Sequence, residues 1–308
     1  MYDIIILGSG PAGLTAALYA ARGGKKTLVL GGDQLGGQMA TIHSLENYPG
    51  TPGVNGLALA NTMKEQAETF GAEFVFASAK TIGHKTYGIG HIYNVLADDG
   101  KEYESKSVII ATGAKPRRLD TKGIREFTGR GVSYCATCDG FFYTDKDVIV
   151  VGGGNSALND ALYLADHARS VRILYRKGAF SRGEAILVDR VLANEKISVM
   201  FDTEITEVGG PSPQSGAEAS GVEYVITNKG EKIECAGVFI AIGHEANTDY
   251  LSESVLRDEQ GRLAPKNLPD GMYVAGDVQS ELKMQVATAV GAGCDAAMDC
   301  IIYINSMK

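Results

Sequence analysis

The chain has 308 residues, of which 44% are hydrophobic and 21% charged, an ordinary balance for a globular protein. This length exceeds the usual size of one domain, so two domains are expected. The formal net charge of −8 argues against nucleic acid or an anionic membrane as the main partner, because both require a basic face. The first residues do not have the basic lead and apolar length of a secretion signal, and we expect a cytoplasmic protein.

The first predicted unit is a strand, a tight turn and a helix. Residues 3–7 form a short apolar run that ends in Gly8-Ser9-Gly10-Pro11-Ala12-Gly13, and apolar residues then recur at helical spacing. Glycines in this pattern permit the turn, let backbone N–H groups approach a pyrophosphate and let helix and strand pack closely. One such fingerprint is a weak signal. The acidic ribose ligand expected about 20 residues later is also missing, because the second strand ends in Gly31-Gly32.

The next stretch combines irregular segments with a helix and a set of strands. A helix is expected over 56–70, and short strands over 73–107 with a hairpin turn at 98–101. Turn residues around 35–38 and 46–50 predict irregular segments of the kind that line a ligand.

A comparable plan then repeats. A strand over 147–151 leads into a second fingerprint, Gly152-Gly153-Gly154-Asn155-Ser156-Ala157, and a helix follows. A strand over 171–175 and a hairpin near 228–230 come next, and the buried strand that ends at Gly243 mirrors an earlier one that ends at Gly113. The segment 209–221 predicts a surface loop.

The last third contains no nucleotide turn of its own. A buried strand that ends at Asp277 and an apolar helix over 284–304 most simply complete the first domain. The predicted fold is therefore α/β, with two Rossmann-like, three-layer ββα nucleotide-binding domains, the second inserted in the first. We expect one domain at 1–115 with 246–308 and the other at 116–245.

Two thiols, Cys135 and Cys138, are separated by two residues just before the second fingerprint. Such a pair closes a small disulfide and favours a thiolate near neutral pH. The alternative is structural zinc, which takes four ligands, and Cys235, Cys294 and Cys300 form no second pair at this spacing. A redox disulfide is favoured, with the other three cysteines as packing thiols and no metal.

Together these residues resemble the low-molecular-weight, bacterial-type thioredoxin reductases, which are FAD-containing flavoproteins. The resemblance covers nearly the whole chain and is most specific at Cys135-Ala136-Thr137-Cys138-Asp139-Gly140. It implies that electrons pass from a reduced nicotinamide to FAD, then to the Cys135–Cys138 disulfide and on to a thioredoxin-like protein, in a homodimer. It also implies that Cys138 faces the flavin, that Cys135 attacks the partner's disulfide and that Asp139 is the acid/base, which agrees with the need of thiol exchange for a nearby proton donor.

The resemblance also implies two sets of cofactor ligands. The FAD ligands are expected at Gly8, Gly10, Pro11, Ala12, Gly13, Gln38, Asn47, Thr112, Gly113, Gly276, Asp277 and Gln285. The NADPH ligands are expected at Gly152, Gly154, Asn155, Ser156, Ala157, Arg176, Lys177 and Arg182. The five histidines, none of them close to the C-terminus, are read as surface or packing residues, which separates the chain from the larger glutathione-reductase type.

The electron donor stays open between three possibilities. Basic residues after the strand that ends at Tyr175 suit the extra phosphate of NADPH, but the family pattern has His and Arg where this chain has Tyr175 and Lys177. NADPH is ranked first, with NADH or a reduced ferredoxin as alternatives. A flavin redox sensor without turnover is a second kind of function, against which Asp139 and the complete second turn weigh.

Overall fold

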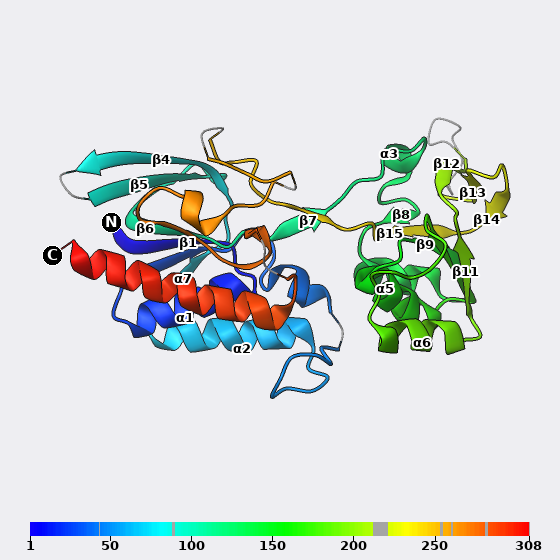
Figure 1. The fold of residues 1–308 in the computed structure, drawn as a ribbon, viewed down its shortest axis with the longest axis horizontal. Coiled ribbons are helices and arrows are strands. Elements are labelled where there is room, and N and C mark those ends of the chain that lie inside the picture. The colour runs from blue at the N-terminus through cyan, green and yellow to red at the C-terminus, as the bar shows by residue number, and fades with distance from the viewer. Residues whose placement is uncertain are drawn as a thin grey trace. The chain divides into compact units, whose positions relative to one another are not determined.

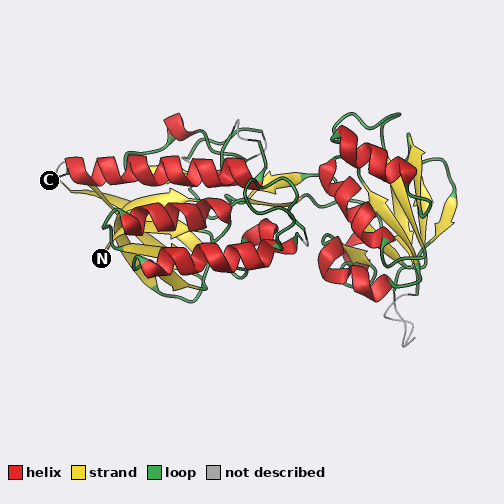
Figure 2. Ribbon diagram, turned by 90° about the horizontal axis from the view of Figure 1, so that it is seen from below, coloured by secondary structure: helices red, strands yellow, loops and turns green. Residues whose placement is uncertain are grey.

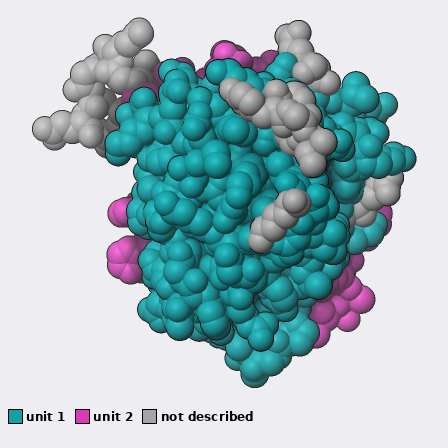
Figure 3. Space-filling view, turned by 90° about the vertical axis from the view of Figure 1, so that its left-hand side faces the viewer, with its two compact units in different colours: residues 1–115, 245–308 teal, residues 116–244 magenta. Residues whose placement is uncertain are grey.

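The computed structural model describes residues 1–42, 44–87, 90–211, 221–252, 255–259, 261–280 and 283–307. The chain divides into two compact units, coloured separately in Figure 3. Unit 1 comprises residues 1–115 and 245–308, and unit 2 comprises residues 116–244. Unit 2 is therefore an insertion in unit 1, and the second division falls one residue before the expected one.

Unit 1 is built on a seven-stranded sheet of the order β3-β2-β1-β6-β5-β4, with β17 paired to β6. Figure 1 labels β1, β4, β5 and β6 of this sheet. The strands are β1 (Tyr2–Leu7), β2 (Thr27–Leu30), β3 (Glu73–Val75), β4 (Ala79–Tyr87), β5 (Gly90–Ala97), β6 (Glu102–Ile110) and β17 (Met272–Val274). Strands β3, β2, β1, β6 and β17 pair in parallel, whereas β4, β5 and β6 pair antiparallel. The expected hairpin turn at 98–101 joins β5 to β6.

Both faces of this sheet are covered, which explains the unbroken apolar run of β1. Ile4 and Ile6 pack with the helical layer, and Ile5 and Leu7 pack in a separate core on the opposite face. Alternation along a strand sends neighbours to opposite faces, so a strand buried on both sides reads as continuously apolar.

Three helices lie side by side on one face of the sheet (Figure 2): α1 (Pro11–Arg22), α2 (Gly56–Thr69) and α7 (Val286–Ser306). A proline at the first position of α1 and the Asn55 cap of α2 begin these helices where their sequence signals predict. Short 3-10 turns follow at η1 (Gly37–Thr41), η4 (Pro265–Asn267) and η5 (Gly276–Val278). Among the described residues, α7 is the one helix long and apolar enough to cross a membrane, but one face of it packs in the core of unit 1.

Unit 2 has a five-stranded parallel sheet of the order β11-β10-β9-β15-β8. Its strands are β8 (Val132–Ser133), β9 (Asp147–Val151), β10 (Ser170–Tyr175), β11 (Ile197–Phe201) and β15 (Gly237–Ile240). A second, antiparallel sheet contains β12 (Ile205–Gly209), β13 (Tyr224–Thr227) and β14 (Lys232–Glu234). The helical elements are α3 (Ile124–Phe127), α4 (Ala136–Asp139), η2 (Gly140–Tyr143), α5 (Asn155–Ala165) and α6 (Ala185–Ala193).

The predicted fold class is confirmed, with departures in detail. Helix α7 begins at Val286 and not at 284, and the element α6 was not expected. Strand β17 ends at Val274, so Asp277 lies in the following turn η5 and not at the end of the strand. Most of the expected surface loop 209–221 lies outside the described residues, because the description stops at 211 and resumes at 221.

The chain passes between the units along a two-stranded sheet of β7 (Ala114–Pro116) and β16 (His244–Ala246). Lys115 Nζ forms ion pairs with Asp249 at 2.5 Å and Glu245 at 3.6 Å beside this pair. The backbone N–H of Asn247 donates to the carbonyl of Gly113 at 3.0 Å. The returning segment is thus hydrogen-bonded to the residues between β6 and β7.

Candidate active site

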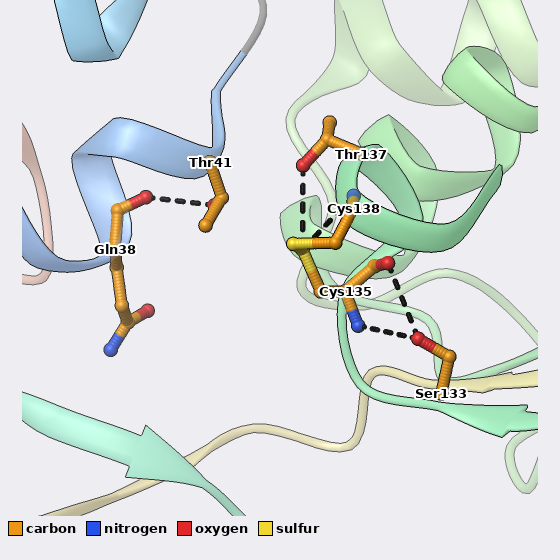
Figure 4. The surroundings of a disulfide bond; sticks show 6 residues. All are labelled: Gln38, Thr41, Ser133, Cys135, Thr137 and Cys138. Carbon is orange, nitrogen blue, oxygen red and sulfur yellow. Dashed lines mark hydrogen bonds between the residues drawn. A yellow bond between two sulfur atoms is a disulfide. The ribbon is translucent and has the colours of Figure 1, made fainter. Parts of the chain in front are cut away.

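Cys135 and Cys138 lie at either end of the first turn of α4 and form a disulfide (Figure 4). Cys135 caps the helix: its Sγ accepts the backbone N–H of Cys138 at 3.2 Å, and the Thr137 hydroxyl lies 3.5 Å away. Cys135 is half-buried and Cys138 exposed. Both neighbouring donors are directed to the sulfur of Cys135, so they stabilise negative charge on Cys135 once the disulfide is opened.

Ser133 fixes the entry into this turn. Its hydroxyl accepts the backbone N–H of Cys135 at 3.0 Å and lies 3.2 Å from the Cys135 carbonyl (Figure 4). Since Ser133 is buried at the end of β8, the dithiol is anchored to the parallel sheet of unit 2. Ser133 was not predicted from the sequence. The one local feature that could have indicated it is its place in a short strand just before the cysteines.

Asp139 is the last residue of α4, and its backbone N–H donates to the carbonyl of Cys135 at 3.2 Å. Burial, and next the charge of Asp139, raise the pKa of Tyr143. The Tyr143 ring packs edge-to-face on Phe239 of β15, with ring centroids 5.2 Å apart. The carboxyl of Asp139 is therefore near enough to the phenol of Tyr143 to affect its pKa, and Tyr143 is a neighbour that sequence reasoning missed.

The first glycine turn has the three geometric features that a pyrophosphate site requires. Gly8 has a φ of 105°, and a Cβ added there would collide with the carbonyl of Ala111, the residue after β6. A Cβ on Gly13 would collide with the Gly8 carbonyl, whereas one on Gly10 meets no described atom within 4 Å. The turn is tight at its first and third glycines and open at the second, where a phosphate approaches the backbone.

Segments far apart in sequence converge on this turn. A Cβ on Gly276 would lie 2.8 Å from the Cβ of Ala12, and one on Gly37 would lie 3.6 Å from the Cα of Gly10. The Thr112 hydroxyl donates to the Asn247 carbonyl at 2.7 Å, and Gly113 follows with a φ of 65°. The expected residues 8–13, Thr112, Gly113 and Gly276 thus lie in one region of unit 1.

In the part of this region that the structure describes, the side chain of Asp277 lacks a hydrogen-bond donor. Its Oδ1 is buried without a hydrogen-bond partner among the described residues. Burial raises the pKa of this carboxyl to about 6. A buried acceptor without a partner beside a pyrophosphate turn fits a ligand whose hydroxyl donates a hydrogen bond to it, because an unpaired buried carboxylate is otherwise costly.

The remaining expected ligands of this region are hydrogen-bonded to their neighbours. Asn47 Nδ2 donates to Gln285 Oε1 at 3.0 Å, although the two are far apart in sequence. Gln38, on η1, donates through Nε2 to the carbonyl of Ala114. Asn47 and Gln285 therefore lie together, at the start of α7, as one polar pair.

The second turn repeats this geometry in unit 2. Gly152 has a φ of 145°, and a Cβ there would collide with the Ala241 carbonyl. A Cβ on Gly154 meets no described atom within 4 Å, and Ala157, in the place of the third glycine, is fully buried. Asn155 and the exposed Ser156 begin α5 with backbone N–H groups that have no partner within the helix.

Comparison with known proteins agrees with this constellation of two turns and one disulfide. Residues 2–293 match the family described as pyridine nucleotide-disulphide oxidoreductase. The thioredoxin reductase of Rickettsia felis is 39% identical, over 98% of both chains. The crystal structure of Lactococcus lactis thioredoxin reductase superposes with a TM-score of 0.91 at 34% identity, and covers 99% of this chain and 100% of its own.

The chain belongs to the thioredoxin reductase branch of the pyridine nucleotide-disulphide oxidoreductases. Membership of this family implies a flavin and a nicotinamide cofactor. The resemblance found in the sequence is thereby confirmed. A more distant relative in structure is the ferredoxin-flavin thioredoxin reductase of Clostridium acetobutylicum, which is 27% identical with a TM-score of 0.51 and covers 99% of this chain and 98% of its own.

In this thioredoxin reductase family member, the basic residues expected near the second turn are exposed. Arg176 and Lys177 follow the end of β10, and Arg182 pairs with Gly154 in an isolated parallel bridge. Tyr175 is buried: its ring underlies Gly153 and stacks on Phe180 with centroids 5.7 Å apart. Tyr175 is therefore a packing residue, and the three cations remain available to a ligand.

No three His, Cys, Asp or Glu side chains gather as metal ligands within the described part of the chain. Cys235 and Cys300 are buried, and burial raises the pKa of each thiol to about 12. His84 and His91 contact each other on the β4–β5 hairpin, while burial lowers the pKa of His244. His43 lies outside the described residues.

Proposed function

We propose that the protein is a thioredoxin-disulfide reductase that passes electrons from NADPH through FAD and the Cys135–Cys138 disulfide to a thioredoxin-like protein. The observation that carries this proposal is the disulfide itself, formed at the start of α4 in a unit that also contains a complete nucleotide turn. A second turn of the same design lies in the other unit. Two nucleotide sites and one dithiol are the parts of an electron relay.

The described residues of unit 1 fit FAD. The open side of Gly10 and the N-terminus of α1 would hold its pyrophosphate, and the orphaned Oδ1 of Asp277 would accept a hydroxyl of its ribityl chain. Thr112, Gly113, Gln38 and the Asn47–Gln285 pair would surround the remainder. When bound, FAD takes a hydride from the nicotinamide and passes two electrons to a disulfide.

The chain's own residues perform the thiol chemistry. In the reduced protein, the Cys135 thiolate attacks one sulfur of the partner's disulfide, which breaks that S–S bond and forms a mixed disulfide. Asp139 supplies the proton that the leaving thiolate takes up. Cys138 then loses its proton to the Asp139 carboxylate and attacks the sulfur of Cys135, which restores the internal disulfide and releases the partner's second sulfur as a thiolate; this thiolate takes the proton from Asp139. Two electrons have passed from the enzyme dithiol to the partner, whose two protons come from Asp139 and Cys138.

The assignment of Cys135 as the attacking thiol rests on its hydrogen bonds. Its sulfur receives the N–H of Cys138 and lies beside the Thr137 hydroxyl, and these groups stabilise a thiolate between turnovers. Cys138 is the more exposed of the two in this structure. We assign Cys138 to the exchange with the flavin because it follows Cys135 by one helical turn and has no comparable donors among the described residues.

The donor is proposed to be NADPH. Arg176, Lys177 and Arg182 are exposed and make no ion pair among the described residues, so all three can approach an additional phosphate. NADH is the alternative if these cations do not distinguish NADPH from NADH. Reduced ferredoxin is a further alternative, but the complete turn at Gly152–Ala157 favours a nicotinamide.

An apolar surface next to the dithiol supports a protein substrate. Phe141 and Phe142 follow Asp139 in the turn η2 and are 73% and 70% exposed. Two consecutive, exposed phenylalanine rings close in sequence to a redox disulfide indicate a docking surface, because monomeric proteins seldom expose neighbouring large apolar side chains without a partner. We propose that a thioredoxin-like protein covers them while its disulfide reaches Cys135.

We further propose a cytoplasmic homodimer joined through the helical layer of unit 1. A groove between α1 and α2 is lined by Tyr19, Arg22 and Phe70, and the outer face of α7 exposes Met298 and Ile302. The same face of α7 carries exposed Asp295 and Asp299. Apolar surface together with opposite charges on one protomer permits an isologous contact with a second copy.

The test of the proposed function is turnover. The purified flavoprotein is mixed with NADPH, a thioredoxin and a chromogenic disulfide, and reduction of the chromogenic disulfide is followed by absorbance. Catalytic reduction only when thioredoxin is present supports the proposal. Stoichiometric reduction that stops after one equivalent would instead identify a redox sensor without turnover.

A further inference from the structure

Asn155, an expected nucleotide ligand, has its side chain engaged within the protein. Asn155 Nδ2 donates to Glu184 Oε1 at 2.7 Å, and Asn155 Oδ1 accepts the backbone N–H of Glu184, also at 2.7 Å. The two hydrogen bonds are reciprocal and join the first residue of α5 to the residue that precedes α6. Glu184 was not among the residues that the sequence indicated.

Glu184 does not cap its own helix. It is the N-cap of α6 by position, but its side chain accepts no N–H of that helix and reaches Asn155 instead. The neighbouring Gly183 lies directly on α5, because a Cβ there would come 2.5 Å from Leu158. The segment before α6 is therefore held against the first turn of α5 by both packing and hydrogen bonds.

The same segment carries Arg182. Its backbone pairs with Gly154, the open glycine of the second turn, in the isolated parallel bridge. The backbone of Arg182 thus lies beside Gly154, and the adjoining residues Asn155 and Glu184 are joined by the two hydrogen bonds. If the Glu184 carboxylate is lost, one of these two hydrogen bonds is removed, the segment that carries Arg182 is held less firmly beside Gly154, and the position of the Arg182 guanidinium is less well defined.

We propose that Glu184 is a positioning residue that holds Arg182 beside the second nucleotide turn and thereby sets the preference for a phosphorylated nicotinamide. The inference rests on the proposed use of NADPH and deepens it. Arg182 acts on the additional phosphate, which only NADPH carries, whereas the turn itself contacts the pyrophosphate common to both nucleotides. Loss of Glu184 should therefore weaken the binding of NADP⁺ more than the binding of NAD⁺.

Three variants separate this role from a merely structural one. Glu184→Ala removes the acceptor for Asn155. Glu184→Gln removes the charge but keeps an Oε1 that accepts the same hydrogen bond, so it should restore binding. Asp189→Ala is the matched control, because Asp189 is an exposed carboxylate on α6 itself.

The Kd values of NADP⁺ and NAD⁺ for the oxidised flavoprotein are measured by isothermal titration calorimetry, so that no turnover is required. We expect Glu184→Ala to raise the Kd of NADP⁺ about five-fold and to change that of NAD⁺ less than two-fold, since one exposed, charge-assisted hydrogen bond is removed. Glu184→Gln and Asp189→Ala should stay within about two-fold of wild type.

An unchanged NADP⁺ affinity in Glu184→Ala overturns the proposal, as does an equal loss for both nucleotides or a loss in Glu184→Gln as large as in Glu184→Ala. Turnover of the wild type with NADPH and thioredoxin is measured in parallel. Its absence, with the binding differences present, refutes the proposed function and leaves the role of Glu184 standing. A wild type that binds neither nucleotide overturns both.

Discussion

Replacement of Asp277 by asparagine should stabilise the flavin-free protein but weaken its binding of FAD. Burial raises the pKa of this carboxyl from 3.8 to about 6 in the folded protein, and its Oδ1 has no partner among the described residues. The folded protein therefore binds the proton more tightly than the unfolded chain. Above pH 6 the carboxyl is charged and buried, and it destabilises the folded protein most. This destabilisation decreases as the pH falls through 6 and is gone below 3.8.

The magnitude follows from linkage. With pKa values of 3.8 unfolded and about 6 folded, the charged carboxyl costs the apoprotein about 1.6 kcal/mol at pH 5 and about 3 kcal/mol at pH 8. Asp277→Asn removes the titration. We expect the difference in the free energy of unfolding, variant apoprotein minus wild-type apoprotein, to increase by about 1.4 kcal/mol from pH 5 to pH 8.

The assay is urea unfolding of the flavin-free wild type and variant at pH 5 and pH 8, with the difference between the two proteins compared across pH so that other titrating groups cancel. The same substitution should weaken FAD binding at least ten-fold, because the carboxylate that accepts a ribityl hydroxyl is lost. A difference between variant and wild type that is independent of pH would refute the raised pKa. An unchanged FAD affinity would refute the assignment of Asp277 as a ligand.

Three further predictions concern the relay. Cys135→Ser should abolish thioredoxin reduction while NADPH still bleaches the flavin, because only the exchange with the partner is lost; persistent thioredoxin reduction would reassign the attacking thiol. Gly154→Val should keep the fold, since a side chain there meets open space, but should raise the KM for NADPH at least ten-fold, measured beside thermal unfolding. Phe141→Ala should raise the KM for thioredoxin about ten-fold with an unchanged rate of flavin bleaching, and a normal KM would exclude this surface as the docking site.

The main elements of the fold could be predicted because their signals are local. The apolar run of β1 and the glycines at 8, 10 and 13 together specify a strand, a turn and a helix, and the repeat at 152–157 specifies the second unit. The position of the disulfide was predictable because the spacing of Cys135 and Cys138 alone allows it. These features depend on neighbours within about one turn or one strand.

Features that depend on distant partners could not be predicted in this way. Strands β7 and β16 are three residues long and lie about 130 residues apart, so neither shows an apolar alternation. The hydrogen bonds between Asn155 and Glu184 join residues 29 positions apart, and a glutamate before a helix reads as an ordinary cap. The unpaired Oδ1 of Asp277 is likewise a property of its surroundings, which only the structure supplies.

The central claim is that electrons pass from NADPH to a bound flavin and then to the Cys135–Cys138 disulfide. The most direct measurement is an anaerobic titration of the purified flavoprotein with NADPH, followed by flavin absorbance and by thiol labelling of Cys135 and Cys138, with NADH in parallel. We expect NADPH to bleach the flavin, two thiols to become labelled, and oxidised thioredoxin to reverse both changes. If a chemical reductant bleaches the flavin but neither nicotinamide does, the second nucleotide site does not serve the relay and the proposed donor is wrong.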